Sequence, residues 1–215
     1  MKRSTRRMPT RPASSRAALA VTAAGAAILL LSTLVPIAGA QTAQEDMEWA
    51  EPARLASESL MLGIAEAGGR IFAVGDRGHI LVSEDKGATW TQARVPTRSM
   101  LNAVVAVDGN NAWAVGHDTV IVHTSDGGKT WERQYFAPDD ASPLFAVWFE
   151  DANHGLAIGA YAYVLETHDG GTTWERLEVD EEERHWNGIA QAPDGTLYVA
   201  AEFGTVFQSE DRGKT

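Results

Sequence analysis

Three features of the 215-residue sequence predict an all-β fold built from one repeated four-stranded unit. First, the segments SEDKGATW (83–90), TSDGGKTW (124–131) and THDGGTTW (167–174) recur about every 42 residues, and SEDRGKT (209–215) is a partial fourth copy. We call this segment the Asp motif. Second, each period holds four short runs of β-branched, aromatic and alternating apolar residues, bounded by turn-forming residues. Third, no segment after residue 40 has the 3.6-residue periodicity of a helical repeat. A four-strand unit of this length is typical of a β-propeller blade.

The first 40 residues predict a secretory signal peptide. The segment MKRSTRRMPTRPASSR has six basic side chains and no acid, and an apolar run from Ala17 to Ala40 follows it. Ala38 and Ala40 form an A-x-A site, which predicts cleavage after Ala40 and export. An uncleaved membrane anchor is the alternative, since the apolar run could nearly span a bilayer. Cleavage would change the formal net charge from −11 to −17.

Residues 41–60 are predicted to be an N-terminal segment that contains a ring-closing strand. Trp49 precedes Met61 by 12 residues, much as Trp90 precedes Leu101 by 11. We therefore expect residues around Trp49 to form a lone fourth strand that closes the ring against the last blade.

Residues 61–215 are predicted to form blades at 61–100, 101–143 and 144–185, and a truncated one at 186–215. The first strands are MLGIAEA, LNAVVAV, LFAVWFE and WNGIAQA, and the second are RIFAVGD, NAWAVGH, HGLAIGA and TLYVAAE. The third are HILVSED, VIVHTSD, YVLETHD and TVFQSED, and the fourth are TWTQARV, TWERQYF and TWERLEV. Because the sequence stops one residue before the expected tryptophan, we expect a fragment of a longer ring. The alternative is a closed ring of four blades, completed by the strand around Trp49.

The order of strands assigns the turns to two faces. Turns between second and third strands, and the loops to the next blade, belong to one face, which we call the loop face. The Asp motif joins third to fourth strands and belongs to the opposite face, which we call the Asp-motif face.

The Asp motif has the residues that a tight turn requires. Its Asp can accept hydrogen bonds from backbone N–H groups, its Gly tolerates positive φ, and its Ser or Thr hydroxyl can join the network. Its Trp can bury roughly 150–250 Å² between neighbouring blades. Since no nucleophile is paired with a base, we predict a structural role for Ser83, Asp85, Gly87, Trp90, Thr124, Asp126, Gly128, Trp131, Thr167, Asp169, Gly171, Trp174, Ser209, Asp211 and Gly213.

The pattern S/T-x-D-x-G-x-T-W is similar to the Asp-box, or bacterial neuraminidase repeat. The longer units NAWAVGHDTVIVHTSDGGKTW (111–131) and HGLAIGAYAYVLETHDGGTTW (154–174) resemble the repeat of the photosystem II stability and assembly factor family, over about residues 60–215. This resemblance implies a seven-bladed propeller, of which this chain has about four blades. It also implies a non-catalytic factor in the periplasm, or in the thylakoid lumen if the organism is photosynthetic, that holds membrane-protein subunits or an envelope complex. Leu156, Tyr198 and Ala201 depart from the family's pattern, and an arginine-rich surface is not evident.

The loop face is the candidate partner-binding surface. It is predicted to present Asp76, Arg77, Arg98, His117, Asp118, Tyr161, Glu202 and Phe203, with the acidic segments APDDASP (137–143) and VDEEERH (179–185) beside them. These residues could bind a basic protein segment or a divalent cation, and a merely solvated set of loops is the alternative. His117 is the histidine to test, while His79, His123, His154, His168 and His185 are interpreted as locally satisfied.

A carbohydrate-active or carbohydrate-binding propeller, similar to a sialidase, is the alternative function. Such a site needs an arginine cluster, a tyrosine nucleophile with a carboxylate partner, and an acid/base Asp. An R-I-P type segment is absent between residues 41 and 83, and no metalloprotease, phosphate-loop or dinucleotide motif occurs. We therefore predict a protein partner and no catalytic residue, cofactor, metal or small-molecule substrate. The acidic charge disfavours nucleic acid, and the absence of cysteine excludes disulfides.

Overall fold

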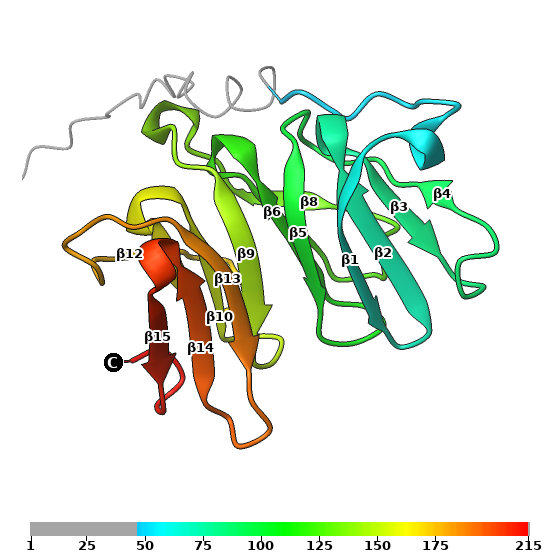
Figure 1. The fold of residues 1–215 in the computed structure, drawn as a ribbon. Helices are drawn as coiled ribbons and strands as arrows, with labels where there is room; N and C mark the ends of the chain where they lie inside the picture. Colours follow the sequence, from blue (N-terminus) through cyan, green and yellow to red (C-terminus); the bar gives the residue numbers. More distant parts are fainter. Residues whose placement is uncertain (1–46, 215) are drawn as a thin grey trace, which may run out of the picture. The chain divides into compact units, whose positions relative to one another are not determined.

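Four antiparallel sheets make up residues 47–214, the part of the chain that the computed structural model describes (Figure 1). The first sheet contains β1 (Met61–Ala67), β2 (Arg70–Gly75), β3 (Ile80–Ser83) and β4 (Thr91–Gln92), and the second contains β5 (Leu101–Ala106), β6 (Ala112–Gly116), β7 (Ile121–Thr124) and β8 (Glu132–Tyr135). The third contains β9 (Leu144–Phe149), β10 (Gly155–Gly159), β11 (Val164–Thr167) and β12 (Glu175–Leu177), and the last contains β13 (Trp186–Gln191), β14 (Leu197–Ala201) and β15 (Val206–Ser209). Each sheet follows the order of the chain, which confirms the predicted all-β fold of four-stranded blades.

The sheets pack face to face as propeller blades. The first strands of successive sheets, β1, β5, β9 and β13, lie next to one another (Figure 1). An apolar core fills each of the three spaces between neighbouring sheets. In the two inner sheets the second strands, β6 and β10, are buried at every position because both of their faces are covered. The sheets therefore stabilise one another chiefly through apolar burial.

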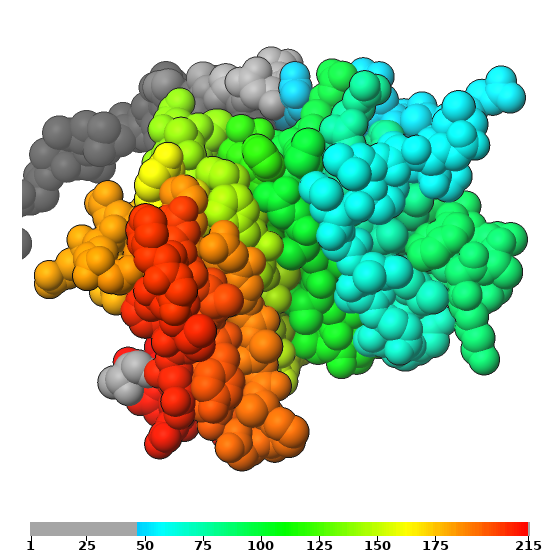
Figure 2. All heavy atoms as spheres, viewed as in Figure 1, coloured from blue at the N-terminus to red at the C-terminus, as the bar shows by residue number. Residues whose placement is uncertain are grey.

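The last sheet differs because only one of its faces is covered among the described residues. Its second strand, β14, buries alternate residues only, and Tyr198 is 40% exposed. Val206 of β15 is 65% exposed, and Figure 2 shows this part of the chain, orange to red, at the surface. The alternation of buried and exposed residues is the normal pattern for a strand with one solvated face.

Two tryptophans of the Asp motif connect neighbouring blades, whereas Trp90 packs within the first blade. Trp131 belongs to the second blade but packs edge-on against Phe72 of the first, with ring centroids 6.2 Å apart. Trp174 of the third blade joins the core between the second and third sheets and packs edge-on against Phe149. Each of these indoles therefore fills the space between two sheets rather than the interior of one.

The N-terminal segment does not form the predicted strand. Residues 47–60 contain only a short 3₁₀ turn, η1 (Ala56–Glu58). The backbone N–H of Ala50 donates to the carbonyl of Val95 (2.9 Å), and that of Ala53 donates to Oε1 of Gln92 (2.8 Å). These contacts hold the segment on the outer strand of the first blade by isolated bonds, without a strand ladder. Closure of the ring against a later blade stays a prediction.

The predicted signal peptide, residues 1–40, lies outside the described residues. Within residues 47–214, no helix has the length and apolar character needed to cross a membrane.

Candidate functional site

The loop face repeats one backbone turn in all four blades. Between the second and third strands lie the short 3₁₀ turns η2 (Asp76–Gly78), η3 (His117–Thr119), η5 (Ala160–Ala162) and η6 (Glu202–Gly204). In each turn the middle residue has a left-handed backbone, with φ of 54° at Arg77, 58° at Asp118, 54° at Tyr161 and 58° at Phe203. This conformation is costly for residues other than glycine, so the surrounding structure must hold it. Every described blade therefore presents one side chain from the same strained position.

Hydrogen bonds to the incoming chain fix each turn. The backbone N–H of the first turn residue donates to the carbonyl just before the first strand of the same blade. The pairs are Asp76 to Leu60 (3.0 Å), His117 to Met100 (2.9 Å), Ala160 to Pro143 (3.0 Å) and Glu202 to His185 (3.1 Å). The approach is so close that a Cβ on Gly116 would lie 1.9 Å from the Met100 carbonyl oxygen. The side chains of the loop face are thus held on rigid supports.

The first two blades give the loop face a charged half. Arg98 and Asp118 line a hollow of about 320 Å³, together with Glu48, Thr97, Ser99, Arg133 and Phe136. The Ser99 hydroxyl donates to Oδ2 of Asp118 (2.6 Å), and the Arg133 guanidinium lies 4.4 Å from the centre of the Phe136 ring. Arg133 is not among the residues predicted from the sequence, although its place in the fourth strand, near the loop to the next blade, is a signal for it.

Arg98 also borders a second hollow under the N-terminal segment. This smaller hollow, of about 150 Å³, is lined by Arg77 and His79 as well as by residues 51–53. A guanidinium nitrogen of Arg98 lies 2.8 Å from a carboxylate oxygen of Glu51. Arg77 pairs loosely with Asp76 (3.4 Å), and its side chain is 79% exposed. The charged half therefore combines acidic and basic groups around two adjoining hollows.

The third and fourth blades give the loop face an aromatic half. Tyr161 is 53% exposed and Phe203 is 88% exposed. The backbone N–H of Tyr161 donates to Nδ1 of His185 (2.9 Å), and that of His185 donates to Oε2 of Glu202 (3.1 Å). Of the predicted face residues, Tyr161 and Glu202 are thus linked through His185, whereas the exposed His117 belongs to the charged half. Exposed aromatic rings on fixed turns favour contact with a partner.

A buried tyrosine, hydrogen-bonded to an exposed carboxylate, tests the enzyme alternative. The Tyr163 hydroxyl donates to the Asp140 carboxylate and lies 3.2 Å from the Tyr135 hydroxyl. Burial raises the pKa of the Tyr163 phenol, and the hydrogen bond to Asp140 raises it further. A tyrosine nucleophile needs access to substrate and an activating base, whereas Tyr163 is only 2% exposed and its proton is strongly held. This pair fits a structural role.

The Asp-motif face repeats one hydrogen-bond network. In the first blade, the Ser83 hydroxyl donates to Asp85 (2.8 Å) and accepts from the Gly87 N–H (2.8 Å). The Asp85 carboxylate accepts from both the N–H (2.8 Å) and the hydroxyl (2.6 Å) of Thr89. The same bonds join Thr124, Asp126, Gly128 and Thr130, and also Thr167, Asp169, Gly171 and Thr173, and the serine bonds recur at Ser209, Asp211 and Gly213.

These hydrogen bonds leave the carboxylate poorly suited to proton transfer. The hydrogen bonds from Thr89 and Thr130 lower the pKa values of Asp85 and Asp126 to about 2. A carboxylate that is ionised and saturated with local donors is a poor general acid or base near neutral pH. The network stabilises the turns, and it contains no nucleophile paired with a base.

Comparisons with known proteins agree with this architecture. The family model described as "Photosynthesis system II assembly factor YCF48" matches residues 41–139 and 138–215. The photosystem II stability/assembly factor HCF136, chloroplastic, of Cyanidioschyzon merolae is 40% identical over 53 residues, which cover 24% of this chain and 12% of that protein.

Solved structures share the fold. A structure titled "YCF48 bound to D1 peptide" superposes with a TM-score of 0.58 at 22% identity, covering 72% of this chain and 52% of that one. The GH74 enzyme of Niastella koreensis gives a TM-score of 0.55 at 16% identity, covering 69% of this chain and 30% of the enzyme. This chain therefore spans about half of the YCF48 structure.

Proposed function

Because the chain belongs to the photosynthesis system II assembly factor YCF48 family, we propose that it is an exported, non-catalytic propeller that binds a protein partner during assembly. The observation that carries this proposal is the loop face. Four identical turns hold four different side chains, Arg77, Asp118, Tyr161 and Phe203, at one end of the blades. A surface that keeps its backbone constant and varies its side chains is suited to recognising one particular partner.

The chemistry of the loop face favours a polypeptide segment. Its charged half offers both donors and acceptors, as a peptide backbone requires, and its aromatic half offers apolar area for side chains. Nucleic acid is a poor ligand because the chain has a formal net charge of −11. The relative solved with a D1 peptide supports a peptide as the class of ligand. The partner is a membrane-protein subunit or an envelope complex.

The signal-like first 40 residues support export to the periplasm, or to the thylakoid lumen if the organism is photosynthetic. N-terminal sequencing of the protein purified from the cell envelope tests this part. Gln41 is the expected first residue, and a chain that keeps residues 1–40 would contradict cleavage.

A carbohydrate-active propeller is the weaker alternative. The likeness to GH74 enzymes is one of fold, and Tyr163 lacks the access that a nucleophile needs. Incubation of the full-length protein with a fluorogenic sialic-acid glycoside and with xyloglucan tests this alternative. We expect no hydrolysis, and turnover of either substrate would overturn the non-catalytic proposal.

Two matched arginine and lysine variants test the binding face. Arg77 and Lys86 are both exposed and both have a left-handed backbone (φ 54° and 60°), but they lie on opposite faces. Binding of a labelled D1 peptide to the full-length protein can be followed by fluorescence anisotropy. We expect Arg77→Ala to weaken binding about tenfold, as loss of a charged contact of about 1.4 kcal/mol would, and Lys86→Ala to leave it unchanged. Equal effects of the two variants would contradict the proposal.

A further inference from the structure

Three potential metal ligands meet on the Asp-motif face of the third blade, and two of them are histidines that the sequence alone suggests are locally satisfied. Glu166 lies in β11, His168 follows that strand, and His154 directly precedes β10. The register pairs Gly155 with Thr167, so the positions of His154 and His168 are opposite each other across the hairpin. Glu166 and His168 are two residues apart and therefore share one side of the strand. The strand pairing itself brings the three side chains together.

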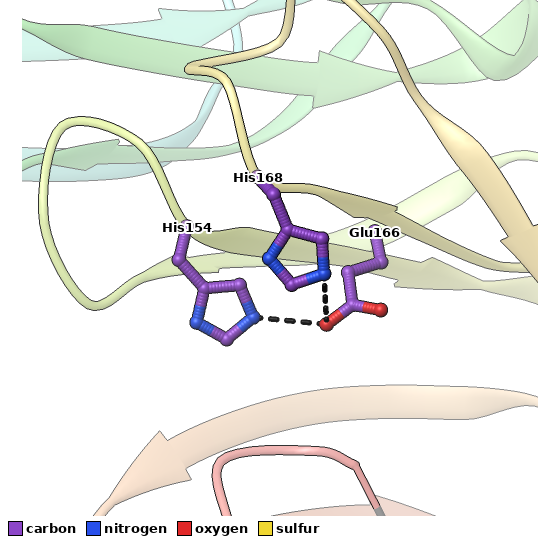
Figure 3. A group of neighbouring side chains, drawn as sticks. All are labelled: His154, Glu166 and His168. Carbon is purple, nitrogen blue, oxygen red and sulfur yellow. Dashed lines mark hydrogen bonds and ion pairs between the residues drawn. The ribbon is translucent and has the colours of Figure 1, made fainter.

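Both histidines direct Nε2 toward the same carboxylate oxygen of Glu166 (Figure 3). Nε2 of His154 lies 2.9 Å from Oε1 of Glu166, and Nε2 of His168 lies 3.4 Å from the same oxygen. The three ligand atoms lie within 4.8 Å of one another. A tetrahedral zinc ion with bonds of about 2.0–2.2 Å separates its ligand atoms by about 3.4 Å. The side chains thus stand close to the spacing that one such ion imposes.

The burial of the three residues suits a site with an open position. The side chains of His154 and Glu166 are each 14% exposed, so they are held by packing, whereas that of His168 is 65% exposed. The imidazole of His168 can therefore rotate the short distance that coordination needs without repacking the blade. Solvent can complete the coordination from the same side, as in zinc sites with three protein ligands and one water.

A carboxylate behind His154 orients the ring. Oε2 of Glu150 lies 3.4 Å from Nδ1 of His154, and Oε1 of Glu150 lies 2.8 Å from the Arg212 guanidinium. A proton on Nδ1 that faces Glu150 leaves Nε2 as the metal-binding nitrogen. Such a carboxylate–histidine pair is the usual support of a histidine ligand and raises its basicity.

The other blades show that the fold does not require these residues. At the three equivalent positions the first blade has Arg70, Val82 and Glu84, the second has Asn111, His123 and Ser125, and the fourth has Thr196, Gln208 and Glu210. In the first blade the outer two positions form an ordinary ion pair, Arg70 to Glu84 (2.9 Å). Only the third of these four blades combines two imidazoles with a carboxylate. Since an ion pair is sufficient at the same place in the first blade, the needs of the turn do not explain that combination.

We propose that His154, Glu166 and His168 bind a divalent first-row transition metal ion, for which Zn²⁺ is the reference. Two imidazole nitrogens and one carboxylate oxygen suit zinc, copper or nickel, whereas magnesium and calcium prefer oxygen ligands alone. The site lies on the face opposite the partner-binding loops, and its Glu150–Arg212 link reaches the Asp motif of the fourth blade. The ion would bind independently of the protein partner.

Titration of the tag-free full-length protein with Zn²⁺ tests the proposal, followed by calorimetry and by NMR of the histidine rings. We expect one zinc ion per chain, joint shifts of the His154 and His168 ring resonances, no shift of His117, and no competition from excess Mg²⁺. His168→Ala should weaken zinc binding at least about 100-fold, and Glu150→Gln about 10–100-fold. His117→Ala, which removes an exposed histidine from the loop face, is the matched control and should bind as the wild type does.

Absence of stoichiometric binding in the wild type would overturn the proposal. So would equal zinc affinity in His168→Ala and His117→Ala. Because His168 is exposed, its removal should leave thermal unfolding unchanged, which keeps a folding defect separate from a lost ligand. If His168→Ala does fail to fold, the ring shifts of the wild-type protein still decide the question.

Discussion

The two ends of the blades differ in what is repeated, which is the side chains at one end and only the backbone at the other. On the Asp-motif face the side chains themselves recur, and each Asp accepts the same bonds, as Asp85 does from Thr89 and Asp126 does from Thr130. On the loop face only the backbone recurs, while the side chain at its left-handed position changes from Arg77 to Tyr161 and Phe203. Repeated side chains indicate a requirement of every blade, which is folding. A repeated backbone with changing side chains indicates a requirement of the whole surface, which we propose is recognition.

Three positions beside the Asp motif do not follow this rule, because their side chains differ in all four described blades. His154, Glu166 and His168 occupy positions where the neighbouring blades have other residues, although the turn beside them is unchanged. Positions whose side chains vary between the blades therefore mark the candidate sites on both faces. Substitutions on the two faces should therefore separate stability from recognition.

Removal of a Trp wedge should have the largest effect on stability. Trp131 is 5% exposed and packs against the first blade, and its indole N–H has no hydrogen-bond partner in the described part of the chain. Trp131→Ala should therefore lower the free energy of unfolding by about 3–5 kcal/mol through lost packing. Urea denaturation of the full-length protein measures this. A loss below about 1 kcal/mol would show that the wedge does not couple the blades.

Removal of an Asp-motif carboxylate should have a smaller effect on stability and none on recognition. Asp126→Ala deprives the Thr130 N–H and hydroxyl and the Thr124 hydroxyl of their acceptor. We expect a loss of about 1–2 kcal/mol in the free energy of unfolding. Partner binding by the folded fraction should not change. Weaker binding without loss of stability would show that recognition uses the Asp-motif face and not the loop face.

Acid should weaken the same network. The hydrogen bonds hold the pKa values of Asp85 and Asp126 at about 2, below the ordinary value of about 3.9 for an unfolded chain. Their contribution to stability is therefore complete above about pH 4 and is lost as the pH falls through about 2. The urea concentration at the unfolding midpoint should decrease as the pH is lowered from 5 to 2. This decrease should be smaller in Asp126→Asn. Identical pH profiles of the two proteins would refute this linkage.

Truncation of the loop-face aromatics should have the smallest effect on stability. Tyr161 and Phe203 are largely exposed, so Tyr161→Ala and Phe203→Ala should each change the free energy of unfolding by less than about 0.5 kcal/mol. Both variants should bind the partner more weakly. Thermal unfolding and peptide binding, measured on the same samples, check the pair of expectations. A large destabilisation would mean that these rings serve the fold.

The repeat made the fold predictable from sequence. Its period located the strands because each apolar run ends at a turn residue, and the first strands begin at Met61, Leu101, Leu144 and Trp186, where the repeated segments begin. The turn bonds could be anticipated as well, because Ser83, Asp85 and Gly87 form them locally. The N-terminal segment has no such repeat, and its contact with Gln92 depends on one side-chain amide that no periodicity indicates.

The candidate sites were less predictable because they depend on register and on contacts between blades. Pairing of Gly155 with Thr167 brings His154 and His168 together, and counting along the sequence alone does not give that register. The hollow beside Arg98 joins the N-terminal segment to two blades, including Glu48 and Arg133. Such sites form only when the sheets are stacked. Local sequence patterns therefore indicate which residue types a site contains, but not which particular residues come together in it.

Backbone NMR of the full-length protein with a D1 peptide distinguishes the two faces residue by residue. We expect amide resonances to shift at the four loop-face turns, residues 76–78, 117–119, 160–162 and 202–204, and to stay fixed at the Asp motifs, residues 83–90, 124–131 and 167–174. The same titration of Arg77→Ala should need about tenfold more peptide to reach the same shifts, whereas that of Lys86→Ala should match the wild type. Shifts concentrated at the Asp motifs would contradict the division of the molecule into a folding face and a recognition face.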